Sequence, residues 1–320
     1  MIKTAFFASD PIALESIKFL FSSKEYPLVC VVSNPDKPKG RGNKVSPNEV
    51  SAWAIENNVA LLRPDKSPDA ATVARLRELG VELVVVMAYG RMLRENILNY
   101  GKYPCLNLHA SVLPHLRGAS PIESAIALRD KETGVSLMKI EPAMDTGPVC
   151  AVGKVLINAR ETSQTLREKI GMLAAKVLND NIADVCSGKA NFVEQQHFLA
   201  TYARKFDKSD AQIDFSLCAE DIDARIRAFG FGTFEYNGEI FKAKDCLAFV
   251  GTSESGVCGK VLKASVSDGL RVSCAGGAVR FDSLQAPCAK MMCAKEFFLA
   301  KKIEEGFILK FSSAKKILRD

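Results

Sequence analysis

The chain has 320 residues, of which 48% are hydrophobic, and its formal net charge at pH 7 is +6. That length favours two domains over one, and the hydrophobic content is enough for a sizeable core. The longest strongly apolar stretch, residues 83–88, is far shorter than the ~20 residues that span a bilayer, and the N-terminus lacks a secretory pattern, so we expect a soluble, cytoplasmic protein with no membrane partner.

The first half of the chain alternates short apolar runs with segments of helical periodicity. In chain order we expect a strand at 3–8, a helix at 11–22, a strand at 28–33, a helix at 46–57, a helix at 69–79, a strand at 82–88, a strand at 106–109, a helix at 121–129, strands at 134–140 and 149–157, and a helix at 161–187. This order predicts an α/β fold with a doubly wound, mainly parallel, Rossmann-like sheet.

The second part of the chain shows a different pattern of expected secondary structure. Residues 191–200 are polar and follow neither period, which is typical of a linker, and a segment with helical character follows at 209–229. Short strands are then expected at 241–243, 247–250, 259–262, 270–273 and 279–284. The pattern predicts a smaller C-terminal β-barrel of OB-like type. We therefore expect a catalytic domain at 1–190, a linker at 191–207 and a C-terminal domain at 208–320.

The ten cysteines are scattered along the chain without a CxxC pair, and none of the three histidines has a metal-ligand spacing to a cysteine. In a reducing cytosol such cysteines are small core hydrophobes. We therefore expect neither a disulfide framework nor a metal.

Three polar residues are placed to form a catalytic site. Asn107 and His109 are two apart in an expected strand, so both side chains project from one face at its carboxyl end. Open α/β sheets bind their ligands at that end. Asp145 lies in a turn between two later strands and can reach the same crevice. Its Asp-Thr-Gly turn also occurs in aspartic proteases, but their dyad needs a second copy, which the sequence lacks.

A family resemblance rests on these residues. Residues 107–114 and 117–121 resemble the signature of the folate-dependent formyltransferases, whose catalytic Asn, His and Asp fall on Asn107, His109 and Asp145. Nearly the whole chain resembles the members of this superfamily that formylate methionyl-tRNA. The resemblance implies an enzyme that moves the formyl group of 10-formyltetrahydrofolate, its donor substrate, to the free amino group of methionyl-initiator tRNA for translation initiation.

Such a transfer needs the residue types found here. Attack on the formyl carbon gives a tetrahedral species with a negative oxygen, to which the Asn107 amide and an N–H of His109 can donate. One such donor lowers the activation free energy by ~2.7–4 kcal/mol. Asp145 can orient and charge His109, or relay a proton through water.

The resemblance also implies a folate pocket beside the corner that ends the most apolar strand. There the backbone offers hydrogen bonds to the pterin edge, together with the loop that carries Asp145. The expected folate-binding residues are Met87, Ala88, Tyr89, Gly90, Ser111, Leu113, Pro114, Glu141, Ala143 and Met144.

A basic loop favours tRNA as the acceptor. Residues 36–44 hold four cations against one acid, with glycines that allow close approach of the backbone to phosphates. The loop resembles the one with which the tRNA enzymes engage the acceptor stem, and residues 202–208 resemble the entry to their C-terminal domain. The expected tRNA-binding residues are Lys37, Lys39, Arg41, Lys44, Lys205 and Lys208.

Two segments depart from the family pattern and leave alternatives open. The family usually has a turn that contains proline and tryptophan where this chain has residues 227–233, which contain neither. The family usually has Gly-Lys where this chain has Ala289-Lys290. A formyltransferase acting on a nucleotide-linked amino sugar would share the three catalytic residues without needing the basic loop. A glycinamide ribonucleotide enzyme would end near residue 200, and a non-catalytic RNA-binding protein would leave the catalytic constellation unexplained. We expect a monomer.

Overall fold

A computed structural model describes residues 1–39, 44–251 and 256–319. The chain divides into two compact units. The first unit comprises Met1–Pro121, Glu132–Leu156 and Arg167–Tyr202, and the second comprises Ile122–Lys131, Ile157–Leu166 and Ala203–Asp320. The division into domains at 1–190 and 208–320 stays a prediction.

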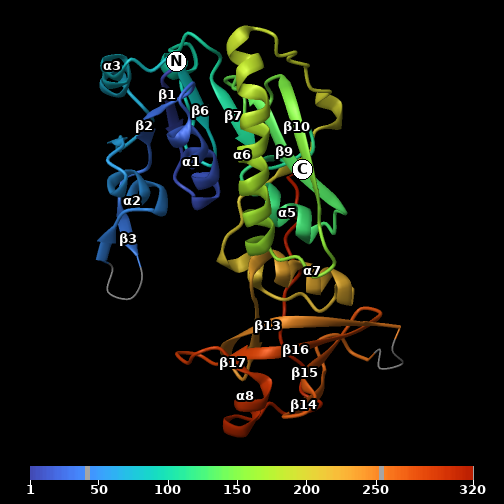
Figure 1. Ribbon diagram of the computed structural model, residues 1–320. Coiled ribbons are helices and arrows are strands. Elements are labelled where there is room, and N and C mark those ends of the chain that lie inside the picture. Colours follow the sequence, from blue (N-terminus) through green and yellow to red (C-terminus); the bar gives the residue numbers. More distant parts are fainter. Residues whose placement is uncertain (40–43, 252–255, 320) are drawn as a thin grey trace. The chain divides into compact units, whose positions relative to one another are not determined.

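The first unit is built on a seven-stranded sheet (Figure 1). Its strands, in spatial order, are β10 (Val149–Leu156), β9 (Glu132–Lys139), β7 (Leu106–His109), β6 (Leu83–Val86), β1 (Thr4–Phe7), β2 (Leu28–Val32) and β5 (Ala60–Leu62). The five strands from β7 to β5 are parallel, whereas β9 and β10 are antiparallel to their neighbours. The expected mainly parallel α/β sheet is therefore confirmed.

Helices cover this sheet because its central strands are apolar on both faces. The helices of the first unit are η1 (Pro11–Ala13), α1 (Leu14–Ser22), α2 (Glu49–Glu56), α3 (Ala70–Leu79), α4 (Glu95–Leu98), most of α6 (Ser163–Ser187) and η2 (His197–Leu199), whereas α5 (Pro121–Ala127) falls almost entirely in the second unit. On one face, Phe7 shares a buried cluster with Leu76 of α3 and Ile97 of α4. Phe6, the residue before Phe7 on β1, is also fully buried. It points to the opposite face of the sheet, where α1 and α6 run (Figure 1).

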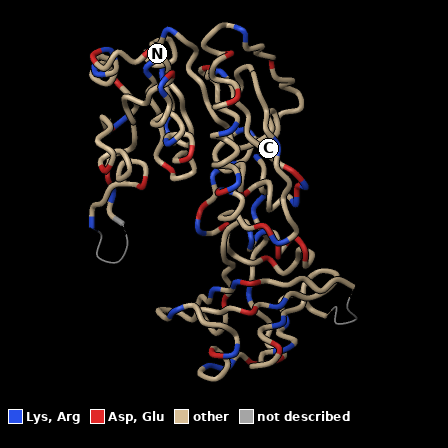
Figure 2. The backbone as a smooth tube through the Cα atoms, in the orientation of Figure 1, with Lys and Arg blue, Asp and Glu red and all other residues tan. Residues whose placement is uncertain are grey.

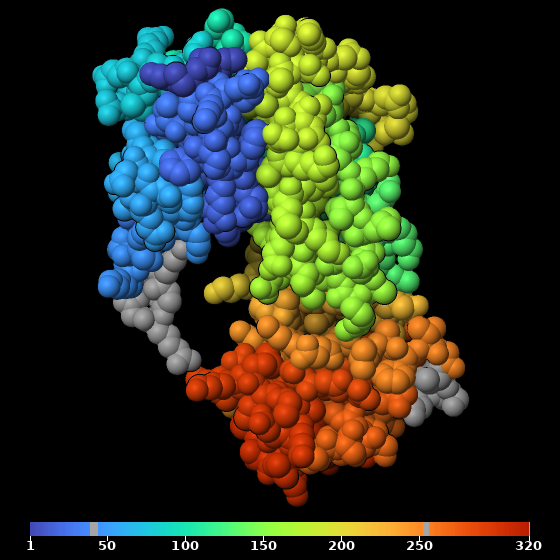
Figure 3. All heavy atoms as spheres, viewed as in Figure 1, coloured from blue at the N-terminus to red at the C-terminus, as the bar shows by residue number. Residues whose placement is uncertain are grey.

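The long helix α6 forms much of one visible surface of this unit (Figure 3). It lies close against β10 because Gly153 has no side chain. A Cβ at Gly153 would lie 2.7 Å from Val177 Cγ2 and 2.8 Å from Leu173 Cδ1. Both distances are too short for ordinary carbon contacts, so with a larger residue at this position the side chains of Val177 and Leu173 would have to move.

Local capping explains where the helices begin and end. Asp69 accepts a hydrogen bond from Thr72 N as the N-cap of α3, and Gly80 ends that helix in the left-handed region at φ 72°. The expected helix at 46–57 begins later, at Glu49, because Asn48 is its N-cap. Ser46 instead ends β4 (Lys44–Ser46), which pairs with β3 (Lys37–Lys39) to form a hairpin.

The second unit contains an antiparallel sheet, which confirms the smaller C-terminal β-domain. Its strands follow the order β12 (Gly232–Tyr236), β13 (Glu239–Val250), β16 (Gly277–Gln285), β15 (Gly269–Cys274) and β14 (Val261–Ser265), and β17 (Met292–Cys293) also pairs with β16. Besides α5, the helices of this unit are η3 (Lys208–Ala211), α7 (Ala219–Phe229) and α8 (Ala294–Ala300). Phe215, Phe234, Phe281 and Phe297 are buried at the centre of the core of this unit.

Strand β13 joins two segments that were expected to be separate strands, 241–243 and 247–250. The charged residues between them interrupt the apolar pattern, but the ladder with β16 continues through Lys244, which pairs with Ser283. Asp245 has φ 52° and accepts a hydrogen bond from the Ser283 hydroxyl. The pairing with β16 therefore maintains the strand where the local sequence does not.

All ten cysteines are free thiols. Cys30, Cys105, Cys246 and Cys274 are buried, and burial raises the pKa of the Cys105 thiol to about 12. Cys288 and Cys293 are exposed, unlike the expected core cysteines. Among the described residues, no helix combines the length and apolar character needed to cross a membrane.

Candidate active site

The structure places Asn107 and His109 at the carboxyl end of β7, in the middle of the sheet. Asn107 pairs with Val86 of β6 on one side and with Met138 of β9 on the other. His109 is buried, with an exposed fraction of 6%, whereas Asn107 is half-buried. Within the part of the chain that the structure describes, the Asn107 amide has no hydrogen-bond partner, so it is available to a ligand.

The two ring nitrogens of His109 have different partners. Nε2 lies 2.9 Å from the Leu116 carbonyl oxygen, which can only accept a hydrogen bond, so Nε2 carries a hydrogen. Nδ1 lies 3.6 Å from Asp145 Oδ2, within ion-pair distance but too far for a direct hydrogen bond. The nitrogen available to a reacting group is therefore Nδ1.

Asp145 reaches this nitrogen from the connection between β9 and β10, where its backbone has φ 54°. Its Oδ2 accepts a hydrogen bond of 2.8 Å from the backbone N–H of Gly118. The same oxygen is the one that faces His109. The loop after β7 and the loop after β9 therefore meet at a single carboxylate oxygen, and the structure brings His109 and Asp145 together, with Asn107 two residues before His109 on β7.

The loop that follows β7 is fastened to the sheet by a buried serine of β9. Ser136 Oγ donates to the Ser111 carbonyl at 2.8 Å and accepts from Leu113 N at 3.0 Å. Ser111 donates its hydroxyl to the His115 carbonyl at 2.5 Å. Of the expected folate residues in this loop, Ser111 and Leu113 are buried and Pro114 is half-buried. The Ser111 hydroxyl is therefore already used within the loop.

The expected folate corner follows β6, whose end lies beside the end of β7 because Val86 pairs with Asn107. Met87 and Tyr89 are buried, whereas Ala88 and Gly90 are exposed with φ of 48° and 76°. The Tyr89 carbonyl accepts a hydrogen bond of 2.8 Å from Asn34 Nδ2. The residues exposed at this corner, Ala88 and Gly90, therefore carry no large side chains, and the Ala88 carbonyl already accepts a hydrogen bond of 3.2 Å from Ser9 N.

The remaining expected folate residues lie just before Asp145 in the same connection. Glu141 is half-buried, and Ala143 and Met144 are exposed. The Ala143 carbonyl accepts a hydrogen bond of 3.2 Å from the Thr146 hydroxyl. Exposed apolar groups beside a polar catalytic cluster are typical of a pocket for a flat, partly apolar ligand.

The expected tRNA-binding cations fall in both units. Lys37 and Lys44 are exposed at the two strands of the β3–β4 hairpin, and the backbone of Lys39 pairs with that of Lys44. The basic residues of the two hairpin strands are blue in Figure 2. Arg41 lies outside the described residues. The second group, Lys205 and Lys208, is exposed and belongs to the second unit.

Two contributions to the site were missed in the sequence because backbone atoms make them. Leu116 holds His109 with its carbonyl, and Gly118 holds Asp145 with its N–H, so neither shows a side-chain signal. A third, the side chain of Gln195, lies in the segment that was interpreted as a linker.

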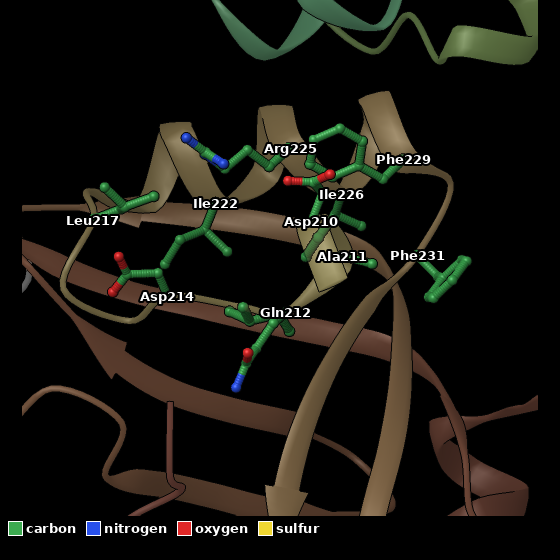
Figure 4. Close-up of a pocket in the computed structure, with 11 residues that line it drawn as sticks. Asp210, Ala211, Gln212, Asp214, Leu217, Ile222, Arg225, Ile226, Phe229 and Phe231 are labelled. Atoms are coloured by element: carbon green, nitrogen blue, oxygen red, sulfur yellow. The ribbon is translucent and has the colours of Figure 1, made fainter. Parts of the chain in front are cut away.

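A separate pocket in the second unit is lined by residues of η3, of α7 and of the segment between them, and by Phe231 (Figure 4). Its acidic groups have structural partners. Asp210 pairs with Arg204, and Asp214 accepts from Ser216 and from Ala314 N. Burial alone would raise the pKa of Asp210, but the hydrogen bonds from Arg204 and Asp207 outweigh it and hold that pKa below its usual range. We therefore assign this pocket a structural role.

The sequence of the chain is similar to the sequences of known formyltransferases. A family model described as formyl transferase matches residues 5–182, and one described as formyl transferase, C-terminal domain, matches residues 205–302. The methionyl-tRNA formyltransferase of Methylobacillus flagellatus is 32% identical over 306 residues, which cover 95% of this chain and 98% of the relative. That of Pseudomonas fluorescens is 34% identical over 313 residues, covering 96% and 97%.

Solved structures show the same fold at lower identity. The N-formyltransferase from Helicobacter canadensis, in complex with folinic acid and dTDP-3-aminofucose, has a TM-score of 0.63 at 17% identity and covers 91% of this chain and 100% of its own. At that identity the likeness concerns the fold alone. The sequence matches confirm the resemblance found in the signature: the chain belongs to the formyl transferase family, and its relatives at 32–34% identity are methionyl-tRNA formyltransferases.

Proposed function

We propose that the chain transfers the formyl group of 10-formyltetrahydrofolate to the free amino group of methionyl-initiator tRNA. The observation that carries this proposal is the convergence of Asn107, His109 and Asp145 at one end of the sheet, in a chain that aligns over nearly its full length with methionyl-tRNA formyltransferases. The product is N-formylmethionyl-tRNA, with which translation begins.

The geometry supports a separate role for each of the three residues Asn107, His109 and Asp145. The unpartnered Asn107 amide donates to the formyl oxygen as it becomes negative. His109 acts through Nδ1, because its Nε2 hydrogen is held by the Leu116 carbonyl. The Asp145 carboxylate lies 3.6 Å from Nδ1 and orients the imidazole, and an N–H at Nδ1 provides a second donor to the oxyanion or a proton to the leaving folate nitrogen.

The attacking amine must lose a proton in the same reaction. Asp145 Oδ2 already accepts from Gly118 N, which leaves its other oxygen to accept the proton from the amine, directly or through a water. Burial of His109 keeps bulk water from this face of the imidazole and strengthens its interaction with the carboxylate.

Folate binding is assigned to the surface around this cluster. We place the pterin against the exposed residues Ala88 and Gly90 and the apolar residues Ala143 and Met144. In this arrangement the formyl group of the donor points toward Asn107. The formyl donor is a substrate, and no metal takes part in the mechanism that we propose.

The basic hairpin favours tRNA over the alternative acceptor, a nucleotide-linked amino sugar. Exposed lysines at Lys37 and Lys44 suit phosphate contact along a nucleic-acid backbone, which a small sugar nucleotide does not offer at length. We assign the C-terminal OB-like domain, with Lys205 and Lys208, to tRNA binding as well. We further propose that the enzyme acts as a monomer in the cytoplasm.

An acceptor competition tests the proposal. The purified protein is mixed with 10-formyltetrahydrofolate and equal concentrations of charged initiator tRNA and a nucleotide-linked amino sugar, and the formylated products are separated. We expect formylmethionine on the tRNA and no formylated sugar. Formylation of the sugar alone would replace the proposed function with its alternative, and formation of neither product would refute both.

A further inference from the structure

Gln195 joins the loop that carries Asp145 to a buried arginine. Its side-chain amide is buried, with an exposed fraction of 8%. Nε2 donates to the carbonyl oxygens of Asp145 at 2.9 Å and Gly147 at 2.7 Å. Oε1 accepts from Arg117 Nε at 3.1 Å and Nη2 at 2.7 Å. Both hydrogens and the oxygen of the amide are therefore used, and its orientation is fixed because carbonyls only accept.

Arg117 is more buried still, with an exposed fraction of 1%. Its other contacts are to His197 Nδ1 at 3.0 Å and the Tyr202 hydroxyl at 3.2 Å. Among the residues that the structure describes, Arg117 has no carboxylate partner within ion-pair distance. A buried cation held only by neutral groups is costly for stability, which points to a role for Arg117 other than packing.

The position of Arg117 in the chain suggests that role. The next residue, Gly118, donates its N–H to the Asp145 carboxylate. Arg117 therefore binds Gln195 with its side chain while the following peptide binds Asp145. Together, Gln195 and the Gly118 N–H hold Asp145 at two points: the backbone carbonyl and the carboxylate.

The residues that follow Gln195 hold the other catalytic loop in the same way. Thr201 Oγ1 accepts a hydrogen bond of 2.8 Å from Leu116 N, and the Thr201 carbonyl accepts one of 2.9 Å from Arg117 N. Leu116 is the residue whose carbonyl fixes His109 Nε2. Residues 195–201, which we call the clasp segment, therefore bond to the backbones of both loops that set the geometry between His109 and Asp145.

We propose that Gln195 is a positioning residue of the formyl transfer reaction, which sets the Asp145 carboxylate against His109 Nδ1 by fixing the backbone of the Asp145 loop. The inference rests on the proposed function, because it assigns Gln195 an effect that acts through Asp145. Gln195 itself does not contact the reacting atoms.

Two substitutions at this position separate positioning from simple charge compensation. Gln195→Ala removes all four hydrogen bonds. Gln195→Glu keeps acceptors for Arg117 and gives that arginine a counterion, but it removes both donors and sets a negative charge against the carbonyls of Asp145 and Gly147. If Gln195 only accommodates Arg117, Gln195→Glu retains activity. If it positions Asp145, both variants lose activity.

We expect kcat for tRNA formylation to fall by about 10²-fold in both variants, because a misplacement of about 1 Å near the chemistry has an effect of this size. The KM values for the folate donor and for charged tRNA should change by less than about threefold. Gln196→Ala is the matched control, since Gln196 is the exposed neighbour. Thermal unfolding of each variant identifies any that fails to fold, and Gln195→Glu serves as the test if Gln195→Ala is unstable.

A double-mutant cycle with Asp145→Asn completes the experiment. Because Gln195 acts through the Asp145 carboxylate, adding Gln195→Glu to Asp145→Asn should lower kcat by less than about threefold further. Additive losses, or normal kcat in Gln195→Glu, would overturn the inference while leaving the proposed function intact. Full activity of Asp145→Asn alone would instead remove Asp145 from the proposed mechanism, and the inference about Gln195 with it.

Discussion

The catalytic cluster and the β3–β4 hairpin both carry polar residues with assigned functions, but they are built in opposite ways. His109 is buried and Asp145 nearly so, and backbone groups of two loops hold them in place. Lys37 and Lys44 are exposed on a two-stranded hairpin. Chemistry at a reacting carbon needs fixed distances, whereas attraction of a polyanion needs only charge close to its surface. Substitutions in the two regions should therefore affect different quantities.

The largest effect is expected for His109→Ala, which removes both the Nδ1 group and the partner of Asp145. We expect kcat to fall by about 10⁴-fold, the upper range for loss of a positioned acid or base, with little change in tRNA affinity. Single-turnover formylation, alongside a direct tRNA-binding measurement, checks this. A folded variant with near-normal kcat would remove His109 from the site.

Asp145→Asn tests whether charge or shape matters at the point where the two loops meet. Asparagine keeps an acceptor for Gly118 N but loses the negative charge that faces His109 Nδ1. We expect kcat to fall by about 10³-fold, somewhat less than the loss seen when a buried triad carboxylate is changed in this way. Asp65→Asn, an exposed carboxylate, is the control. Equal rates for the two variants would make Asp145 a turn residue.

Asn107→Ala should have a smaller effect on kcat, because it removes one donor to the developing oxyanion and leaves the His109–Asp145 pair intact. The expected loss in kcat is about 10²–10³-fold, which corresponds to a rise of ~2.7–4 kcal/mol in the activation free energy. Asn99→Ala, at an exposed asparagine, is the matched control. If the loss appeared in the KM for the folate donor instead of in kcat, Asn107 would be a binding residue rather than a catalytic one.

Much of the catalytic sheet could be predicted because its signals are local. The strand at 106–109 was predicted with the bounds that the structure has, and Asp69 and Gly80 mark the ends of α3 as capping chemistry requires. Strand β5 (Ala60–Leu62) was missed, since three residues carry no period, and it forms only by pairing with β2. Elements that exist because of their neighbours leave little trace in their own sequence.

The residues of the site also differ in how far the local sequence predicts their positions. Asn107 and His109 share a strand, so their spacing alone places them together. Gln195 bonds to partners 48 to 78 residues away, in a segment whose polar composition indicated a linker. Only the packed structure reveals that this polar side chain is buried, because hydrogen bonds to loop backbones impose no period on the sequence.

The smallest expected effect is at the basic hairpin and concerns binding rather than chemistry. Arg41→Ala with Lys44→Ala removes two of the four cations in residues 36–44 and leaves His109 and Asp145 unchanged. Each lost phosphate contact should flatten the log–log salt dependence of tRNA affinity by roughly one unit. The KM for charged tRNA should rise, and the KM for the folate donor should not change. Misplacement of the amine would also lower kcat, but by far less than His109→Ala does.

The control for this variant must remove the same charge elsewhere on the first unit. Lys24→Ala with Lys189→Ala does so at two exposed lysines away from the hairpin in sequence. A salt titration of tRNA affinity for wild type and both double variants separates a local contact from the general field of a protein with net charge +6. Equal slopes in the two double variants would mean that the hairpin contributes only its charge. If both slopes also matched that of wild type, the hairpin would be a solvated surface, and the case for a sugar acceptor would strengthen.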